Sequence, residues 1–336
     1  MTSSHRVFVS TDLGGDPDDI QSLYRLLHYS DVLGIEGISS CTGPGSEPSA
    51  DLIRQWIRRI DVDHLRSEGY PELTPEADIL PLVKQGPTKP REPFEGGNTP
   101  GSDHLIERAN AVDDPDRPLW VLVWGSITGV AQALHDAPEI AERIRIYYIG
   151  SSNTQNDPAA RVWVYDFMHD VYPDLWWIEN GAMPKWSGET FRGVYLGGVQ
   201  RDAWGRHTFL ETHIRGHGST RGGEFDRLCG DAFPTASGTG NEHIDDGGPH
   251  DDVLKEGDSP SILYLLSPRI GGVGDVDDPT QPSWGGRFRL AEPDSHPNYY
   301  VDLDADLPTC WRTINRWRVD FLSDWRDRWD RYATSS

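Results

Sequence analysis

Short apolar runs alternate with helical patterns at the start of the chain. Residues 6–11 (RVFVST) are apolar and β-branched and end at a Gly-Gly turn, which predicts a buried strand. From Asp18 the apolar residues recur at helical spacing. Residues 32–39 then have the pattern of a second strand, and residues 50–60 that of a second helix. This order predicts an α/β fold, with a mostly parallel central sheet and helices on both faces.

The same alternation resumes after a loop-rich stretch at about 70–101, which is dense in proline and glycine. Its pattern predicts strands at 119–124, 144–149 and 175–178, and helices at 128–135 and 159–171.

The periodicity is lost between about 193 and 257, where glycine, histidine and aspartate predominate. A structureless segment of that length is uncommon in a compact domain, so we interpret it as a functional insertion or cap. Residues 259–266 restore helical spacing, and residues 310–332 predict an amphipathic C-terminal helix. Composition does not change abruptly anywhere, so we expect one domain over residues 1–336.

Charge and cysteine usage narrow the classes of partner. The net charge of -23 repels phosphate backbones and anionic lipids, so nucleic acid polymers and membranes are not expected partners. The three cysteines are scattered and form no C-x-x-C pair, which disfavours a disulfide framework and a zinc site. With no apolar signal core and no apolar run of 18 residues, we expect a cytoplasmic protein.

Four aspartates follow the first predicted strand within eight residues: Asp12, Asp16, Asp18 and Asp19. Ligands of parallel sheets bind outside the carboxyl ends of the strands, which is where this segment lies. A single aspartate there would more simply cap the next helix. The whole cluster favours a metal site, because carboxylates repel one another unless a cation intervenes, and hard cations prefer oxygen ligands.

The segment STDLGGDPDD resembles the N-terminal aspartate motif of nucleoside hydrolases, D-x-D-x-G-x-D-D. It is still more similar to the variant in the nucleoside-hydrolase-like branch that is catalogued with cellulose-binding proteins. Four later segments are similar to that branch and occur in the same order: LWVLVWGSITGVAQAL, PDLWWIEN, KEGDSPSILYLL and WGGRF. The resemblance therefore covers most of the chain.

The resemblance implies a Ca²⁺ site. Asp12 and Asp19 would be metal ligands, and Asp12 would also accept a proton from the attacking water. Asp18 would accept hydrogen bonds from sugar hydroxyls. The backbone carbonyl of Trp124 and the carboxylate of Asp258 would complete the coordination, although Trp124 could simply be core and Asp258 could be an ordinary helix cap.

Sugar-binding residues are less firmly indicated. Asn153 and Asn156 follow a strand end as the sugar-binding asparagines of the family do, but they could also be ordinary loop residues. Glu179 and Asn180, after a tryptophan pair that we expect in a buried strand, are further candidates for the pocket wall.

The leaving-group end departs from the family pattern. Many nucleoside hydrolases place a histidine directly before the distal aspartate, and this chain has Gly257 there. Glu256 is one substitute general acid, and His217 and His243 of the insertion are others, although a lone loop histidine is more often simply solvated.

Together these features imply a calcium-dependent glycoside hydrolase that cleaves an N-ribosidic or related furanosidic bond by attack of calcium-bound water on the anomeric carbon. The substrate would be a small-molecule nucleoside or sugar glycoside. Two alternatives are a non-catalytic carbohydrate-binding protein that uses the same pocket, and an interaction protein that acts through the acidic insertion. The Trp-rich terminal helix could serve a homo-oligomer or pack on its own domain.

Overall fold

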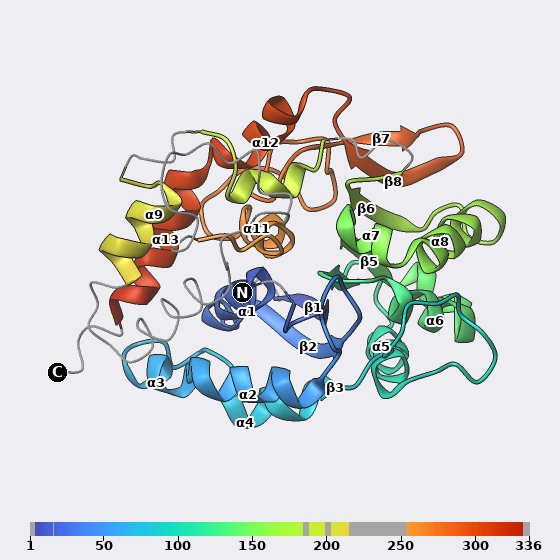
Figure 1. Ribbon diagram of the computed structural model, residues 1–336, viewed down its shortest axis with the longest axis horizontal. Helices are drawn as coiled ribbons and strands as arrows, with labels where there is room; N and C mark the ends of the chain where they lie inside the picture. The colour runs from blue at the N-terminus through green and yellow to red at the C-terminus, as the bar shows by residue number, and fades with distance from the viewer. Residues whose placement is uncertain (1–3, 16, 184–187, 199–202, 215–253, 332–336) are drawn as a thin grey trace.

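A computed structural model describes residues 4–15, 17–183, 188–198, 203–214 and 254–331. Its centre is an eight-stranded sheet in the order β3-β2-β1-β4-β5-β6-β8-β7 (Figure 1). Every neighbouring pair is parallel except the antiparallel hairpin of β7 and β8. The strands are β1 (His5–Thr11), β2 (Leu33–Ser40), β3 (Val83–Lys84), β4 (Leu119–Val123), β5 (Ile144–Ile149), β6 (Trp176–Asn180), β7 (Phe288–Glu292) and β8 (His296–Asp302).

Helices cover both faces of this sheet, as the sequence predicts. Alternate residues of each strand face two separate hydrophobic cores, so that Val7 and Val9 enter one core and Phe8 enters the other. The first core is closed by α1 (Asp18–His28), α2 (Ala50–Ile60), α3 (Val62–Ser67), α11 (Ser259–Leu266) and α13 (Arg318–Trp329). The second is closed by α5 (Pro100–Asn110), α6 (Thr128–Asp136) and α8 (Pro158–Asp170). The predicted α/β class is confirmed.

Shorter elements complete the described chain. They are α4 (Glu76–Ile79), α7 (Ser152–Asn156), α9 (Arg206–Phe209), α12 (Leu307–Asn315), the 3-10 helices Leu80–Leu82, Pro138–Glu142 and Thr190–Val194, and a π-helical turn at Leu210–Ile214. None of the helices in the described part of the chain has the length and apolarity to cross a membrane.

Strand order creates a switch point between β1 and β4. From β1 the chain first builds β2 and β3 on one side, and later β4, β5 and β6 on the other. The loops after β1 and β4 therefore diverge, and such a crevice is where ligands bind in open α/β sheets. Asp12 follows β1 directly, and Trp124 follows β4 directly.

The expected C-terminal helix at 310–332 is two helices, α12 and α13, and the prediction of one helix was wrong. The break lets two side chains on either side of it reach one turn. The Asn315 amide donates to the carbonyl of Leu196 at 3.1 Å, and the Arg318 guanidinium donates to the carbonyl of Gly197 at 3.2 Å. Of the predicted insertion at 193–257, the structure describes 193–198, 203–214 and 254–257.

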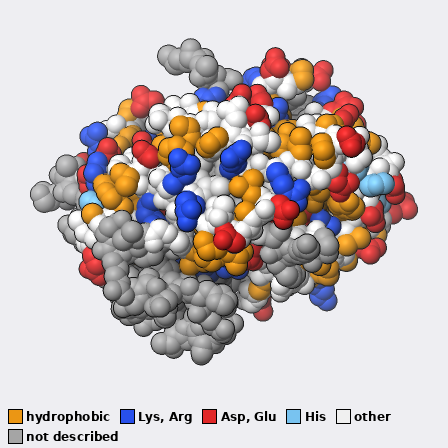
Figure 2. All heavy atoms as spheres, turned by 90° about the horizontal axis from the view of Figure 1, so that it is seen from above, with side chains coloured by type: hydrophobic (Ala, Val, Ile, Leu, Met, Phe, Trp, Pro, Cys, Tyr) orange, Lys and Arg blue, Asp and Glu red, His pale blue; other side chains and the backbone are white. Residues whose placement is uncertain are grey.

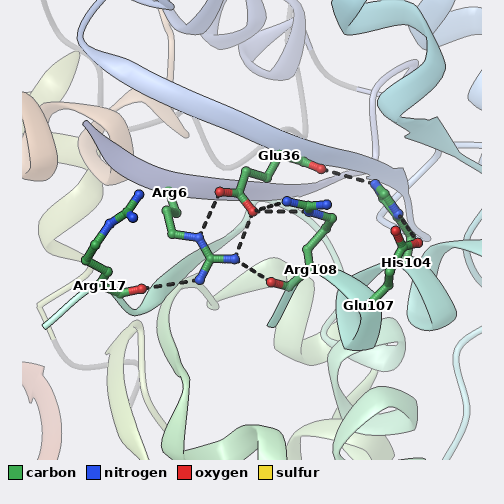
Figure 3. A network of polar contacts seen from close by, with 6 residues as sticks. All are labelled: Arg6, Glu36, His104, Glu107, Arg108 and Arg117. Atoms are coloured by element: carbon green, nitrogen blue, oxygen red, sulfur yellow. Dashed lines mark hydrogen bonds and ion pairs between the residues drawn. The ribbon is translucent and has the colours of Figure 1, made fainter. Parts of the chain in front are cut away.

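A charged network fixes α5 to the sheet (Figure 3). Glu36 is the extra residue at an irregularity in β2, where Val7 pairs with Ile35 and Phe8 pairs with Gly37. Its carboxylate accepts two hydrogen bonds from Arg6 of β1, at 2.8 and 2.9 Å, and two from Arg108 of α5, at 3.1 and 3.0 Å. Burial raises the pKa of Glu36, but the two guanidinium groups outweigh it and hold the pKa below its ordinary value.

We expect Glu36→Gln to lower the free energy of unfolding by about 3 kcal/mol at pH 7, because it leaves the buried Arg6 charge poorly compensated. Urea titration measures this loss. The matched control is Asp51→Asn, which removes an exposed ion pair with Arg54 and should cost less than about 1 kcal/mol. Equal effects of the two variants would contradict a structural role for the network.

The pH dependence follows from the lowered pKa. Glu36 contributes its full stabilisation above the ordinary pKa of 4.5, and that contribution is lost as the pH falls through the lower folded-state pKa. The stability difference between wild type and Glu36→Gln should therefore shrink below pH 4.5.

Candidate functional site

A cavity of about 90 Å³ lies at the carboxyl ends of β1 and β4. Ten residues line it, and these include six of the twelve residues that the sequence predicts for the site: Asp12, Asp18, Asp19, Trp124, Asn153 and Asp258. They come from the loop after β1, the start of α1, the end of β4, the short helix α7 and the start of α11. The fold thus brings segments that are far apart in the sequence together at the switch point of the sheet. Asp16 lies outside the described residues.

Three carboxylates form the innermost group. One oxygen from each of Asp18, Asp19 and Asp258 lies within 4.8 Å of the others. Asp19 and Asp258 are buried, with 3% and 2% exposure, so water screens their repulsion poorly. Calcium binds oxygens at about 2.3–2.6 Å, so two ligands on opposite sides of the ion lie about 5 Å apart. The spacing and the all-oxygen donor set therefore fit a hard divalent cation.

Among the described residues, no aspartate side chain makes a capping bond to α1 or α11. The N-cap position of α1 is Pro17, which makes no side-chain capping bond. Asp258 stands at the N-cap position of α11, but its side chain makes no capping bond, and its backbone carbonyl instead accepts the Ser261 hydroxyl at 2.7 Å. The hydroxyl of Thr11 donates to Asp19 and orients its carboxylate. The simple capping interpretation therefore does not account for Asp258.

Two glycines make room for Asp12. A Cβ atom on Gly43, after β2, would lie 1.3 Å from the Asp12 Oδ2 atom, and one on Gly125, after β4, would lie 2.7 Å from the Asp12 Cβ atom. Both loops thus approach Asp12 so closely that no side chain fits between. The sequence analysis did not single out either glycine, although each stands just beyond a predicted strand end.

Trp124 and Asn153 line the same cavity as the aspartates. The Asn153 amide donates to the carbonyl of Trp124 at 2.7 Å and to that of Ile149 at 2.9 Å. A carbonyl oxygen has two lone pairs, so this bond leaves Trp124 one acceptor position. The Trp124 indole is buried in the core and donates to Ser261 at 2.9 Å. Core packing and a carbonyl ligand are compatible at this residue.

The segment before Asp258 is held by a buried ion pair. Glu256 accepts two hydrogen bonds of 2.6 Å from Arg25 of α1, and both side chains are fully buried. The Gln21 side chain accepts the backbone N–H groups of Lys255 and Glu256 at 2.7 and 2.8 Å. Glu256 also has a φ of 23°, a conformation that costs free energy in a non-glycine residue. Its carboxylate is thus committed to Arg25 and does not line the cavity.

A side chain at the position next to Asp258 would have to displace the Asp18 carboxylate. A Cβ atom on Gly257 would lie 2.6 Å from the Asp18 Oδ2 atom. The ammonium group of Lys255 lies 3.8 Å from that same oxygen. No histidine lines the cavity among the described residues. His217 and His243 lie outside the described residues.

The remaining predicted residues do not line the cavity. Glu179 faces the other side of the sheet, where it is fully buried and receives two hydrogen bonds from Arg161 at 2.8 and 2.7 Å. The Asn180 amide oxygen accepts the backbone N–H of Phe191 at 3.1 Å, so Asn180 positions a lining residue instead of lining the cavity itself. The amide of Asn156 donates to Ser126 at 2.9 Å.

Comparison with known proteins supports the sequence resemblance. The family model described as cellulose-binding Sde182, nucleoside hydrolase-like domain, matches residues 6–288. No curated protein sequence matches the chain.

Several solved structures share the fold. A nucleoside hydrolase-related protein from Saccharophagus degradans, associated with carbohydrate metabolism, is 22% identical over 99% of this chain and 73% of its own, with a TM-score of 0.67. The type III effector XopQ, solved with adenosine diphosphate ribose, is 14% identical over 96% and 94%, with a TM-score of 0.55. A purine-preferring ribonucleoside hydrolase from Gardnerella vaginalis is 14% identical over 95% and 99%, with a TM-score of 0.50.

At these identities the structural likeness establishes the fold alone, whereas the family model covers most of the sequence. The chain therefore belongs to the family of cellulose-binding, nucleoside hydrolase-like domains.

Proposed function

We propose that the chain is a calcium-dependent glycoside hydrolase that cleaves an N-ribosidic or related furanosidic bond in a small-molecule nucleoside or sugar glycoside. One observation carries this proposal. Asp12, Asp18, Asp19 and Asp258 converge on one cavity at the switch point of the sheet, and three of them lie within ligand distance of one another. A structural role would not require so many buried like charges in one place.

Asp19 and Asp258 would hold the metal, with Asp12 and the carbonyl of Trp124 beside them in the same cavity. The bound cation would supply a Lewis acid that lowers the pKa of a water molecule. Asp18 belongs to the same carboxylate group, so it could bind either the metal or a sugar hydroxyl.

The side chains would act on the sugar as follows. Asp12 would accept a proton from the attacking water while the water oxygen bonds to the anomeric carbon. The leaving group would depart with the electrons of the glycosidic bond. The positive charge that develops on the sugar would be stabilised by the surrounding carboxylates. Both N–H groups of the Asn153 amide are directed at carbonyls, so its oxygen is the atom available to a sugar hydroxyl.

A second candidate function is carbohydrate binding without catalysis. The lack of a general acid near the leaving group, among the residues that the structure describes, favours this function. Gly257 has no side chain that could donate a proton, and the carboxylate of Glu256 is bonded to Arg25. The description of the family as cellulose-binding points the same way. Both functions would use the same acidic cavity, so they differ in whether any product is released.

Asp12→Asn should retain the fold and lower turnover by at least about 100-fold, because an amide cannot accept the proton of the attacking water. Reducing-sugar release from a panel of nucleosides and furanosides measures this. Asp320→Asn, on the exposed side of α13, is the matched control and should be as active as wild type. A fully active Asp12→Asn variant would exclude the hydrolytic role. Calcium binding with no product from any substrate would favour the second candidate.

Gly257→Ala should weaken calcium binding by about 10-fold, because its methyl group must displace the Asp18 carboxylate. Calorimetric titration of the chelator-stripped protein measures the affinity. The control is Gly129→Ala on α6, where an added Cβ atom meets its nearest neighbour at an ordinary 3.4 Å. Unchanged affinity in Gly257→Ala would remove Asp18 from the metal site.

A further inference from the structure

A second cavity lies away from the acidic site. It has a volume of about 560 Å³ and lies beside α8, β7, β8 and the segment after β6. Its lining residues Tyr299 and Val301 belong to the second hydrophobic core, whereas Trp124 of the acidic cavity belongs to the first, so the two cavities adjoin opposite faces of the sheet. Small-molecule sites usually measure about 300–1,000 Å³, a range that contains this cavity.

The inner wall of this cavity is a satisfied polar network. Arg161 pairs with Glu179 through two hydrogen bonds and also donates to the Tyr299 hydroxyl at 3.0 Å, which in turn donates to Glu179 at 2.5 Å. The Tyr165 hydroxyl donates to Glu292 at 2.6 Å. These groups are held by one another, so the wall is already organised before any ligand arrives.

The rim carries two polar side chains with bonding capacity to spare. Arg289 is exposed, and its guanidinium donates to the carbonyl of Leu290 at 3.3 Å, so within the described residues most of its five N–H donors remain available. The Asp304 side chain is exposed and forms no hydrogen bond or ion pair within the part of the chain that the structure describes. A ligand at this rim would meet both a strong donor and a strong acceptor.

The side chains that line the cavity carry as many positive as negative charges, and Glu179 behind them adds one more carboxylate, which pairs with Arg161. Arg161 and Arg289 stand against Glu292 and Asp304, in a chain whose net charge is -23. An anionic ligand would meet two carboxylates, and a cationic ligand would meet two guanidinium groups. On the face of the molecule seen in Figure 2, basic, acidic and hydrophobic side chains are interspersed. Local charge therefore favours a neutral ligand.

Apolar atoms supply the rest of the lining. They come from Ala182, Met183, Ala291 and Val301, and Met183 is 40% exposed. A sugar combines hydroxyls, each of which can donate and accept, with apolar C–H faces. This combination matches a cavity whose lining mixes apolar atoms with paired donors and acceptors.

We propose that this cavity is a second binding site, which takes a neutral saccharide independently of the acidic cavity. The two sites are separated by β6, whose neighbouring residues face opposite ways. Glu179 joins the network behind the second site, and Asn180 positions Phe191 of the acidic cavity. The inference goes beyond the proposed hydrolase, because it needs neither a metal nor catalysis.

The test is calorimetric titration with neutral hexasaccharides of glucose, xylose and mannose. Wild type should bind at least one of them. The double variant Arg289→Ala/Asp304→Ala should bind it at least about 10-fold more weakly, because two hydrogen bonds to charged groups are lost. The matched control Arg287→Ala/Asp294→Ala removes an exposed arginine and an exposed aspartate outside the cavity, and it should bind as wild type does.

Asp12→Asn separates this inference from the proposed hydrolase. It alters the acidic cavity and should leave hexasaccharide binding unchanged if the second site exists. The inference is overturned if wild type binds none of the three saccharides, if the rim double variant binds as tightly as wild type, or if Asp12→Asn abolishes binding. None of these results depends on whether a glycoside is hydrolysed.

Discussion

Repulsion between carboxylates at one strand end constrains the architecture around the acidic cavity. Asp12, Asp18 and Asp19 reach one 90 Å³ cavity from the segment after β1, Asp258 reaches it from the start of α11, and three of the four are almost fully buried. Burial in low dielectric strengthens their repulsion, so the surroundings must hold them there. The strand order does this by placing the end of β1 beside that of β4, where the glycine-containing loops leave space for Asp12.

The C-terminal part of the chain supports this arrangement from behind. Trp325 of α13 lies over the Arg25 guanidinium at 4.0 Å, and Arg25 is bonded to Glu256, two residues before Asp258. A buried ion pair contributes little net stability, but removing one partner leaves a buried charge and is costly. This pair therefore fixes where the Asp258 segment lies. Glu256, which the sequence analysis offered as a general acid, thus has a structural role.

The sequence was sufficient for the repeating elements and for residues that act near their own strand end. Uninterrupted apolar runs marked β1, β4 and β5, and the aspartates of STDLGGDPDD needed no distant partner to be identified. The sequence could not predict contacts between residues that are far apart in the chain. Arg25 and Glu256, for example, are 231 residues apart. Helix α5 was missed although Thr99 and Pro100 form a helix-start signal, because its apolar stripe is weak. Glu179 was misplaced because adjacent strand residues face opposite sides.

A crystal structure of the protein grown with millimolar calcium would test the central claim most directly, since that claim is that the acidic cavity holds a divalent cation. The account predicts one strong density peak bonded at about 2.3–2.6 Å to carboxylate oxygens of Asp19 and Asp258. The carbonyl oxygen of Trp124 should coordinate the same cation. A cavity containing only water, with the Lys255 ammonium moved in between the carboxylates, would contradict the account and leave the aspartate cluster without its cation.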